Sequence, residues 1–306
     1  MMGRSVKVRV PGTSANCGPG FDTLGVACTI YNDLELTLLS EDRLEITVEG
    51  EGEKNIPLNS HNMVWRAIQL LLKKGHCDRE YRGAIIRMVN RIPLSRGLGS
   101  SAAAIVAGLK AANVLLENPF SRGELLQFAT SLEGHPDNVA PAIFGGFTIS
   151  LLNQKHAETF SFLPRLTLKL VVAIPSFHLS TRAARNVLPE TVPLKDAVFN
   201  VGRAALLVGA LVKGTPRFLR HAFEDALHQP YRAKLIPGMD DVIKAAKNAG
   251  ALGAVMSGAG PCLMAYTLSE EAAIGEAMIH AFRAHQVEVR CLILDIDRRG
   301  AYIVKE

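Results

Sequence analysis

The sequence predicts an α+β protein with two domains, and three observations support this fold class. The chain has 306 residues, which is enough for two domains of ordinary size. Strand patterns and helical patterns follow one another without a strict strand–helix–strand repeat. Near the middle of the chain, the hydrophobic pattern weakens into a polar stretch at 153–158. We place the domain boundary in that stretch, which gives domains of residues 1–155 and 156–306.

The first domain is predicted to contain four strands and three helices. Hydrophobic residues alternate with polar ones in its strands, as at Val6, Val8 and Val10, and this period of two indicates one buried face. The predicted strands are 6–10, 34–38, 44–48 and 84–89. The predicted helices are 61–75, 100–116 and 119–132.

The second domain is predicted to begin with a strand and then to mix helices with short strands. Its strand signals are short runs of hydrophobic residues, and its helical signals are longer. The predicted strands are 166–174, 254–257, 263–266 and 287–294. The predicted helices are 193–213, 215–227, 238–249 and 269–285.

Composition and charge narrow the classes of function. Hydrophobic residues make up 48% of the chain and charged residues 21%, which is typical of a folded protein with a large core. The net charge of +5 suits an anionic small molecule. Because no basic run has interleaved aromatic residues, we expect no nucleic-acid partner. Because no stretch of about 18 apolar residues occurs and the N-terminus lacks the apolar core of a signal peptide, we expect no membrane span.

The five cysteines are scattered along the chain, and none forms a CxxC pair. Neither a zinc site nor a disulfide framework is therefore predicted. Free thiols fit a reducing compartment, so we expect a cytoplasmic protein.

The most informative segment is the glycine-rich loop at residues 93–104, PLSRGLGSSAAA, which runs directly into a helical pattern. Gly97 and Gly99 have no Cβ to block the close approach of a phosphate. Ser100 and Ser101 are expected to cap the helix that follows. A helix N-terminus also carries partial positive charge and free N–H groups. The loop therefore predicts a site for a phosphorylated ligand.

Two common phosphate-binding motifs do not match this loop. A Walker loop needs a lysine after its last glycine, whereas Gly99 is followed by two serines. A dinucleotide-binding loop needs a third glycine at a spacing that fails here. An ordinary glycine–serine turn into a helix remains the alternative interpretation.

A second motif follows the first strand at residues 11–25, PGTSANCGPGFDTLG. Its glycines and proline predict a tight, exposed loop. That loop presents Asn16 and Asp22, a polar pair suited to a hydroxyl or amine of a small substrate. A purely structural turn with an Asx cap is the alternative.

A third motif, at residues 132–139, concentrates four polar side chains. Glu133 is a candidate magnesium ligand, because this hard cation prefers carboxylate oxygen. Asp137 is a candidate proton acceptor, and His135 and Asn138 are candidates for hydrogen bonds to a substrate. The alternative is a helix end followed by a turn, which Pro136 would favour.

Two further segments carry weaker signals. A second glycine-rich loop at residues 256–262 lies between two short strands and is suited to back onto phosphates or onto the first loop. Arginine and lysine side chains occur in the segments 180–189 and 229–237, and arginine forks bind carboxylates through two hydrogen bonds. Most exposed arginines are merely solvated, so neither segment identifies a site by itself.

Taken in order, the motifs at 11–25, 93–104 and 257–261 resemble those of the GHMP kinases, and the resemblance spans nearly the whole chain. Residues 14–22, 133–141 and 181–189 are similar to segments of the homoserine kinase subfamily. The resemblance implies an N-terminal domain like domain 2 of ribosomal protein S5 and a ferredoxin-like C-terminal domain, with the site between them. Several sister kinases carry a lysine in the first motif, and its absence here disfavours mevalonate kinase and galactokinase.

The resemblance also implies an activity, which is the ATP- and magnesium-dependent phosphorylation of the L-homoserine hydroxyl in threonine biosynthesis. The residues implied to wrap the triphosphate are Pro93, Leu94, Ser95, Arg96, Gly97, Leu98, Gly99, Ser100 and Ser101. Ser100 and Glu133 would hold magnesium, and Asn62 would lie near adenine. The residues implied to contact the amino acid are Asn16, Asp22, His135 and Asn138, with Arg185 and Arg232 at its carboxylate and Thr181 near the hydroxyl and phosphate.

Phosphoryl transfer depends mainly on positioning and charge neutralisation. In-line attack of the hydroxyl on the γ-phosphate is therefore expected, with Asp137 as the nearest candidate base. A late loss of the proton without a base remains the alternative, since the transition state is loose. Two other functions stay open at this point, namely a GHMP kinase for another small hydroxylated substrate and a non-catalytic ligand sensor. The oligomeric state also stays open, a homodimer included.

Overall fold

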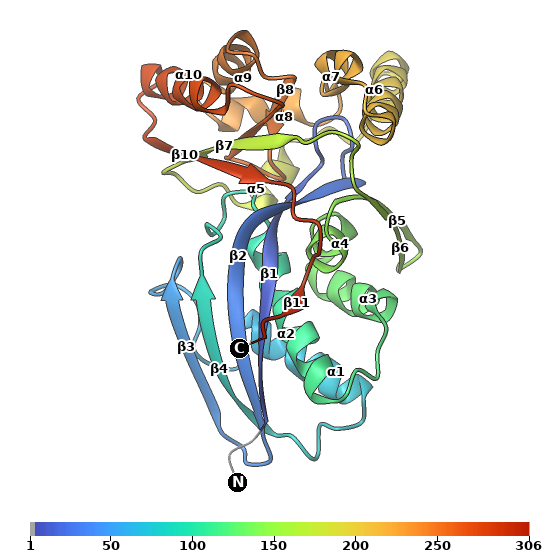
Figure 1. Ribbon diagram of the computed structural model, residues 1–306, viewed down its shortest axis with the longest axis vertical. Coiled ribbons are helices and arrows are strands. Elements are labelled where there is room, and N and C mark those ends of the chain that lie inside the picture. The colour runs from blue at the N-terminus through green and yellow to red at the C-terminus, as the bar shows by residue number, and fades with distance from the viewer. Residues whose placement is uncertain (1–3, 306) are drawn as a thin grey trace.

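The computed structural model describes residues 4–305 and contains two β-sheets with helices packed on them (Figure 1). Strands and helices mix as predicted, so the α+β fold class is confirmed. The larger sheet and its helices occupy the lower part of the view, and the smaller sheet and its helices occupy the upper part. Within the described residues, no helix combines the length and the apolar character needed to cross a membrane.

The larger sheet has seven strands, with β1 and β2 at its centre. Its strands are β1 (Ser5–Ala15), β2 (Leu24–Leu39), β3 (Leu44–Gly50), β4 (Gly83–Asn90), β5 (Phe147–Asn153), β6 (His156–Phe162) and β11 (Tyr302–Ile303). The order is β11-β1-β2-β4-β3, and β5 pairs with both β2 and β6. Only β3 and β4 pair in parallel among the described strands of this sheet.

Four helices belong with the larger sheet, and α2 lies in the middle of them. They are α1 (Met63–Lys74), α2 (Ser100–Leu115), α3 (Arg122–Glu133) and α4 (Pro136–Phe144). The helix α2 is rich in alanine, and buried residues occur on most of its faces. Its small side chains allow neighbouring elements to pack closely against it. A Cβ on Gly108 would lie 2.7 Å from the Val64 carbonyl oxygen, so a larger residue there would push α1 away. This tight packing fixes α2 against α1.

The smaller sheet has the strand order β10-β7-β9-β8, which is the order of a ferredoxin-like β-α-β-β-α-β unit. Its strands are β7 (Lys169–Pro175), β8 (Gly253–Met256), β9 (Leu263–Thr267) and β10 (Val289–Asp295). The helices of this half are α5 (Thr181–Asn186), α6 (Leu194–Lys213), α7 (Pro216–Ala222), α8 (Gln229–Arg232), α9 (Met239–Asn248) and α10 (Glu271–Ala284). Val171, Ile274 and Phe282 belong to a buried cluster formed by the sheet with α9 and α10.

The structure corrects several predictions about local structure. The elements β5, β6 and α4 were not predicted, and β2 begins ten residues before the predicted range 34–38. The segment 11–20 is buried, because β1 continues to Ala15 and pairs with β2, so the predicted exposed loop is wrong. The chain turns only at residues 16–23, which we call the first turn. The helix predicted over 215–227 ends at Ala222, and the short helices α5 and α8 had no clear periodic signal.

The predicted domain boundary at residue 155 falls in the turn between β5 and β6, which pair with each other in the larger sheet. Sheet membership changes later, between Phe162 and Lys169. The C-terminal β11 then returns to the larger sheet beside β1. The division into domains 1–155 and 156–306 therefore stays a prediction.

Candidate active site

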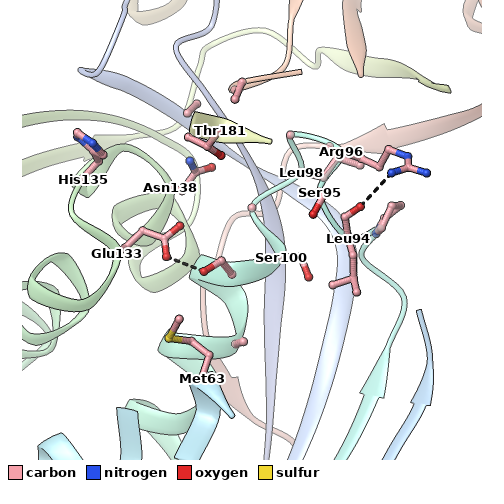
Figure 2. A pocket seen from close by; sticks show the side chains of 18 of the residues that line it. Met63, Leu94, Ser95, Arg96, Leu98, Ser100, Glu133, His135, Asn138 and Thr181 are labelled. Atoms are coloured by element: carbon pink, nitrogen blue, oxygen red, sulfur yellow. Dashed lines mark hydrogen bonds between the residues drawn. The ribbon is translucent and has the colours of Figure 1, made fainter. Parts of the chain in front are cut away.

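A cavity of about 450 Å³ lies where the two sheets and their loops meet. Every residue that received a role from the sequence lines it. These residues are Asn16, Asp22, Asn62, Pro93, Leu94, Ser95, Arg96, Gly97, Leu98, Gly99, Ser100, Ser101, Glu133, His135, Asp137, Asn138, Thr181, Arg185 and Arg232. Glu133, Asn138 and Thr181 lie around the start of α2 (Figure 2). Residues from both halves of the chain thus share one space.

One end of the cavity is formed by residues 93–101, which we call the glycine loop. Three successive carbonyl groups of the loop are held from behind by other parts of the chain. The Leu98 oxygen accepts from Thr13 N at 3.0 Å, and the Arg96 oxygen accepts from Cys262 N at 3.2 Å. The Gly97 oxygen accepts from the Ser257 hydroxyl at 2.6 Å. With its carbonyls bound at the back, the loop is fixed in place.

The amide N–H groups of residues 97–101 make no hydrogen bond within the described part of the chain. The helix α2 begins at Ser100, and its N-cap residue is Gly99, which has a left-handed conformation and no side chain to cap with. The predicted capping by Ser100 and Ser101 is therefore wrong, because both residues already lie inside the first turn of the helix. Uncapped N–H groups at a helix start bind anions well.

Glycine is required at two positions of this loop. Gly97 and Gly99 have φ angles of +79° and +68°, which other residues rarely adopt. A Cβ on Gly97 would overlap the Ser257 carbonyl oxygen, and one on Gly99 would overlap the Thr13 hydroxyl. The loop can approach its neighbours this closely only without side chains there.

Glu133, the last residue of α3, places a carboxylate beside the start of α2 (Figure 2). The Ser101 hydroxyl donates to its Oε2 at 2.7 Å, and burial raises the pKa of Glu133. No cluster of three or more His, Cys, Asp or Glu side chains that could hold a metal occurs among residues 4–305. One half-buried carboxylate with nearby serines fits magnesium, which commonly uses one or two carboxylates, water and substrate phosphates.

Asp137 lies in the first turn of α4, after Pro136, and its side chain is buried. Burial and, to a lesser extent, the neighbouring Asp22 raise the pKa of Asp137 to about 7, against the opposing effect of Arg185. A carboxyl group with a pKa near 7 can exchange a proton at neutral pH.

The amides of Asn138 and Asn16 are oriented by protein contacts. Asn138 Oδ1 accepts from the Thr13 hydroxyl at 2.9 Å, which leaves its Nδ2 as the donor facing the cavity. Asn16 Nδ2 donates to the Gly258 carbonyl at 2.9 Å, and its Oδ1 accepts from Asp22 N at 3.0 Å. Asn16 therefore ties the first turn to the second glycine-rich loop in addition to lining the cavity.

Another part of the cavity carries three charged side chains, Asp22, Arg185 and Arg232, which we call the charged end. Arg185 donates through both terminal nitrogens to the two Asp22 oxygens, at 3.1 and 2.9 Å. Arg232 is 2% exposed, and its Nε donates to the Ala184 carbonyl at 2.9 Å. Two cations and one anion in a half-buried space suit a small molecule with charges of both signs.

The remaining predicted residues line the same space in different settings. Burial lowers the pKa of His135, the N-cap residue of α4, which favours its neutral form. Thr181 begins α5 and is exposed. Asn62 caps α1, since its Oδ1 accepts from Val64 N at 2.9 Å while its Nδ2 donates to Pro57 O. The amide of Asn62 is thus already used within the fold.

Several side chains that shape the site received no role from the sequence. Thr13 orients Asn138, and Ser257 bonds both Gly97 O and, at 2.8 Å, the Ser14 hydroxyl. His228 lies behind Arg232. Thr13, Ser14 and Ser257 stand within recognised motifs, which is a usable signal, whereas nothing in the sequence singles out His228.

Comparison with known proteins agrees with this geometry. A family model described as GHMP kinases N terminal domain matches residues 62–146, and one described as GHMP kinases C terminal matches residues 207–284. The chain belongs to the GHMP kinase family. Its fold and its membership identify it as a phosphotransferase that acts on a hydroxyl group.

Relatives of this GHMP kinase match it over nearly the whole length. A homoserine kinase of Carboxydothermus hydrogenoformans is 43% identical over 296 residues, covering 97% of this chain and 96% of the relative. A homoserine kinase of Moorella thermoacetica is 43% identical over 299 residues, with 97% and 99% covered. The crystal structure of homoserine kinase from Cytophaga hutchinsonii superposes with a TM-score of 0.91 at 32% identity, covering 99% of this chain and 98% of that one.

Proposed function

We propose that this GHMP kinase is a homoserine kinase, which transfers the γ-phosphoryl group of ATP to the side-chain hydroxyl of L-homoserine. The products are O-phospho-L-homoserine and ADP, as in threonine biosynthesis. The observation that carries the proposal is one cavity lined both by free backbone amides and by side chains of both charges. Relatives named homoserine kinase at 43% identity support the choice of substrate.

The glycine loop binds the triphosphate through main-chain amides in this proposal. No lysine is needed, since the N–H groups of residues 97–101 and the α2 N-terminus supply positive potential. Asn62, Met63 and Pro57 line the cavity beyond the loop, where the adenine would lie. The back-side bonds to Thr13 and Ser257 keep the loop from closing on itself when phosphate is absent.

Magnesium would be held by Glu133 and Ser100. The ion, when bound, neutralises charge on the phosphate oxygens. Ser101 keeps the Glu133 carboxylate beside the start of α2 through its 2.7 Å hydrogen bond.

L-Homoserine would bind at the charged end as a zwitterion. The buried Arg232 and the half-buried Arg185 suit its carboxylate, and Asp22 suits its ammonium group. His135 and the Asn138 Nδ2 donor would then face the rest of the molecule, and Thr181 the hydroxyl. A substrate without a carboxylate would leave the buried Arg232 without an anionic partner, so the charged end discriminates against simple alcohols.

Asp137 would accept the hydroxyl proton. Its pKa of about 7 allows it to be ionised before transfer and protonated afterwards at neutral pH. Asn138, next to it on α4, would hold the reacting groups in line.

The five free cysteines fit the predicted cytoplasmic location.

Coupled release of ADP tests the proposal. We expect ATP- and magnesium-dependent ADP formation with L-homoserine, and much lower rates with mevalonate, galactose or shikimate. A higher kcat/KM for any of those alcohols would replace homoserine as the substrate. Binding of homoserine and ATP without any ADP release would instead favour a ligand sensor.

A further inference from the structure

A side chain outside the cavity lining connects the two walls of the charged end. His228 precedes α8 and is 0% exposed. Its Nε2 lies 2.8 Å from the Gly18 carbonyl oxygen in the first turn, the turn that also carries Asp22. Its Nδ1 lies 3.2 Å from Arg232 Nη1. One imidazole thus contacts both the first turn and the arginine.

The partners of His228 define its protonation. A carbonyl oxygen only accepts, so Nε2 must carry a hydrogen, and a guanidinium only donates, so Nδ1 must offer a lone pair. Only the neutral Nε2–H form satisfies both contacts. Burial lowers the pKa of His228 and Arg232 acts in the same direction, against the opposing effect of Asp225, Gly18 and Asp22. The charged groups among these are Asp225 in the preceding loop, Arg232 in α8 and Asp22 in the first turn, and the neutral form prevails.

The contact with His228 determines which way Arg232 can point. Arg232 Nε is bound to Ala184 O, and Nη1 faces His228 with Gly258 O at 3.4 Å. Among the described hydrogen bonds none uses Nη2, so that nitrogen is the donor that Arg232 can offer to a ligand. Phe21 stacks on the His228 ring at 5.1 Å, and the Arg232 guanidinium lies 5.1 Å from the same phenyl ring. The ring stack holds both groups in their planes.

We infer that His228 is a positioning residue, whose Nδ1 lone pair aims Arg232 at the substrate carboxylate while its Nε2–H fixes the first turn. This inference rests on the proposed function, because it names what orients a residue assigned to the L-homoserine carboxylate. His228 itself touches no substrate in this arrangement. Its effect should therefore appear in the binding of the carboxylate and in neither nucleotide binding nor the chemical step.

Two substitutions separate the two nitrogens. In His228→Asn the amide oxygen can take the place of Nδ1 and keep an acceptor for Arg232. In His228→Gln the amide nitrogen can take the place of Nε2 and keep a donor for Gly18, but the acceptor is lost. A guanidinium without its acceptor loses a hydrogen bond to a charged group. We expect His228→Gln to raise the KM for L-homoserine about tenfold or more, and His228→Asn to raise it about threefold or less.

Three controls make the result specific. The KM for ATP and the kcat at saturating homoserine should change less than about twofold in both variants, since the glycine loop is untouched. The inhibition constant of 3-aminopropan-1-ol, which is homoserine without its carboxylate, should not change in His228→Gln. Thermal unfolding of both variants shows whether a general loss of stability contributes.

The inference is overturned if both variants raise the homoserine KM equally or if neither raises it. It is also overturned if His228→Gln weakens the binding of 3-aminopropan-1-ol as much as the binding of homoserine. A wild-type protein that releases no ADP with homoserine would instead refute the proposed function. The two failures are therefore distinguishable in the same set of assays.

Discussion

The two ends of the cavity are built in different ways. The glycine loop is one continuous segment, and it presents main-chain N–H groups at the start of α2. The charged end is made of side chains from remote segments, since Asp22 and Arg185 are 163 residues apart in the chain. The loop depends on backbone conformation at Gly97 and Gly99, whereas the charged end depends on the position of α5 and α8 relative to the first turn.

This difference predicts that the two parts of the cavity can change independently of each other. A backbone cradle recognises phosphate, which is common to all nucleotide triphosphates, and tolerates little change at its glycines. Side chains on short helices can be exchanged without disturbing that cradle. The following variants test whether nucleotide binding and amino-acid binding are separable. The first changes Asp137, which is proposed to act in the chemical step and in neither binding event.

The largest effect is expected for Asp137→Asn, which removes the proposed proton acceptor. We expect kcat to fall about a thousandfold while the KM values for ATP and homoserine stay within about twofold, because a general base contributes about 10²–10⁴ to the rate. Steady-state kinetics at pH 8 measures this. A loss of only a few-fold would show that no base is essential.

Although Asp137→Asn should lower the rate, it should increase the stability of the folded protein at high pH. The pKa of Asp137 is 3.8 when exposed and about 7 in the folded protein, so between these pH values the folded chain keeps a proton that the unfolded chain has lost. The stability of the wild type should therefore fall as pH rises through this window, by at most about 4 kcal/mol. Asp137→Asn cannot ionise, and urea unfolding at pH 5 and pH 8 should find it more stable than the wild type mainly at pH 8. A wild-type stability that rises over the window relative to the variant would contradict this.

Gly97→Ala should impair the use of ATP at the glycine loop and leave the binding of homoserine unchanged. The added Cβ overlaps the Ser257 carbonyl oxygen and the φ of +79° becomes strained, so the loop must shift. A displacement of about 1 Å can cost about a hundredfold in rate, and we expect that loss in kcat/KM for ATP. Isothermal titration of homoserine should give a nearly unchanged Kd.

Gly250→Ala is the matched control for that substitution. Gly250 also has a positive φ, +111°, but the nearest atom to its Cβ would be Glu270 Cγ at 3.8 Å. It should lose about 1 kcal/mol of stability and no activity. Equal losses of activity in both variants would mean that backbone strain, and not the loop position, is responsible.

Arg185→Lys should weaken the binding of homoserine at the charged end and leave the binding of ATP unchanged. Lysine keeps the charge but cannot form the two-point contact with Asp22, and we expect the KM for homoserine to rise about thirtyfold with little change for ATP. Arg182→Lys, on the same helix but exposed, is the control and should behave as wild type. A rise in the ATP KM equal to that for homoserine would show that the two ends are coupled.

The smallest effect is expected for Ser101→Ala, which removes the hydroxyl that holds Glu133. Groups that orient a metal ligand are worth about tenfold in metal affinity, so the magnesium concentration for half-maximal rate should rise by about that factor. Ser131→Ala, on α3 near Glu133 but bonded to Phe128 O, should leave it unchanged. An unchanged magnesium requirement in Ser101→Ala would remove Ser101 from the proposed metal site.

Short-range features of the site could be predicted from sequence. The helix after the loop and the strand directly before it follow from hydrophobic period, and α2 and β4 lie within a residue of the predicted ranges. The strand β2 instead begins at Leu24, ten residues before the predicted range 34–38. The two serines were misplaced as caps because the cap position falls on Gly99, which has a left-handed conformation and no room for a Cβ beside the Thr13 hydroxyl. The burial of residues 11–20 was missed because pairing with β2 is a long-range event.

The sequence by itself determined the glycine loop, since conformational freedom and a following helix start are properties of adjacent residues. It also determined which carboxylates, amides and arginines were available. Only the tertiary structure decided that Arg185 binds Asp22 and that Asp137 is buried enough for a pKa near 7. It also decided that His228 contacts Gly18, which lies 210 residues away in the chain. Hydrogen bonds and burial of this kind depend on distances between remote segments, and no local pattern encodes those distances.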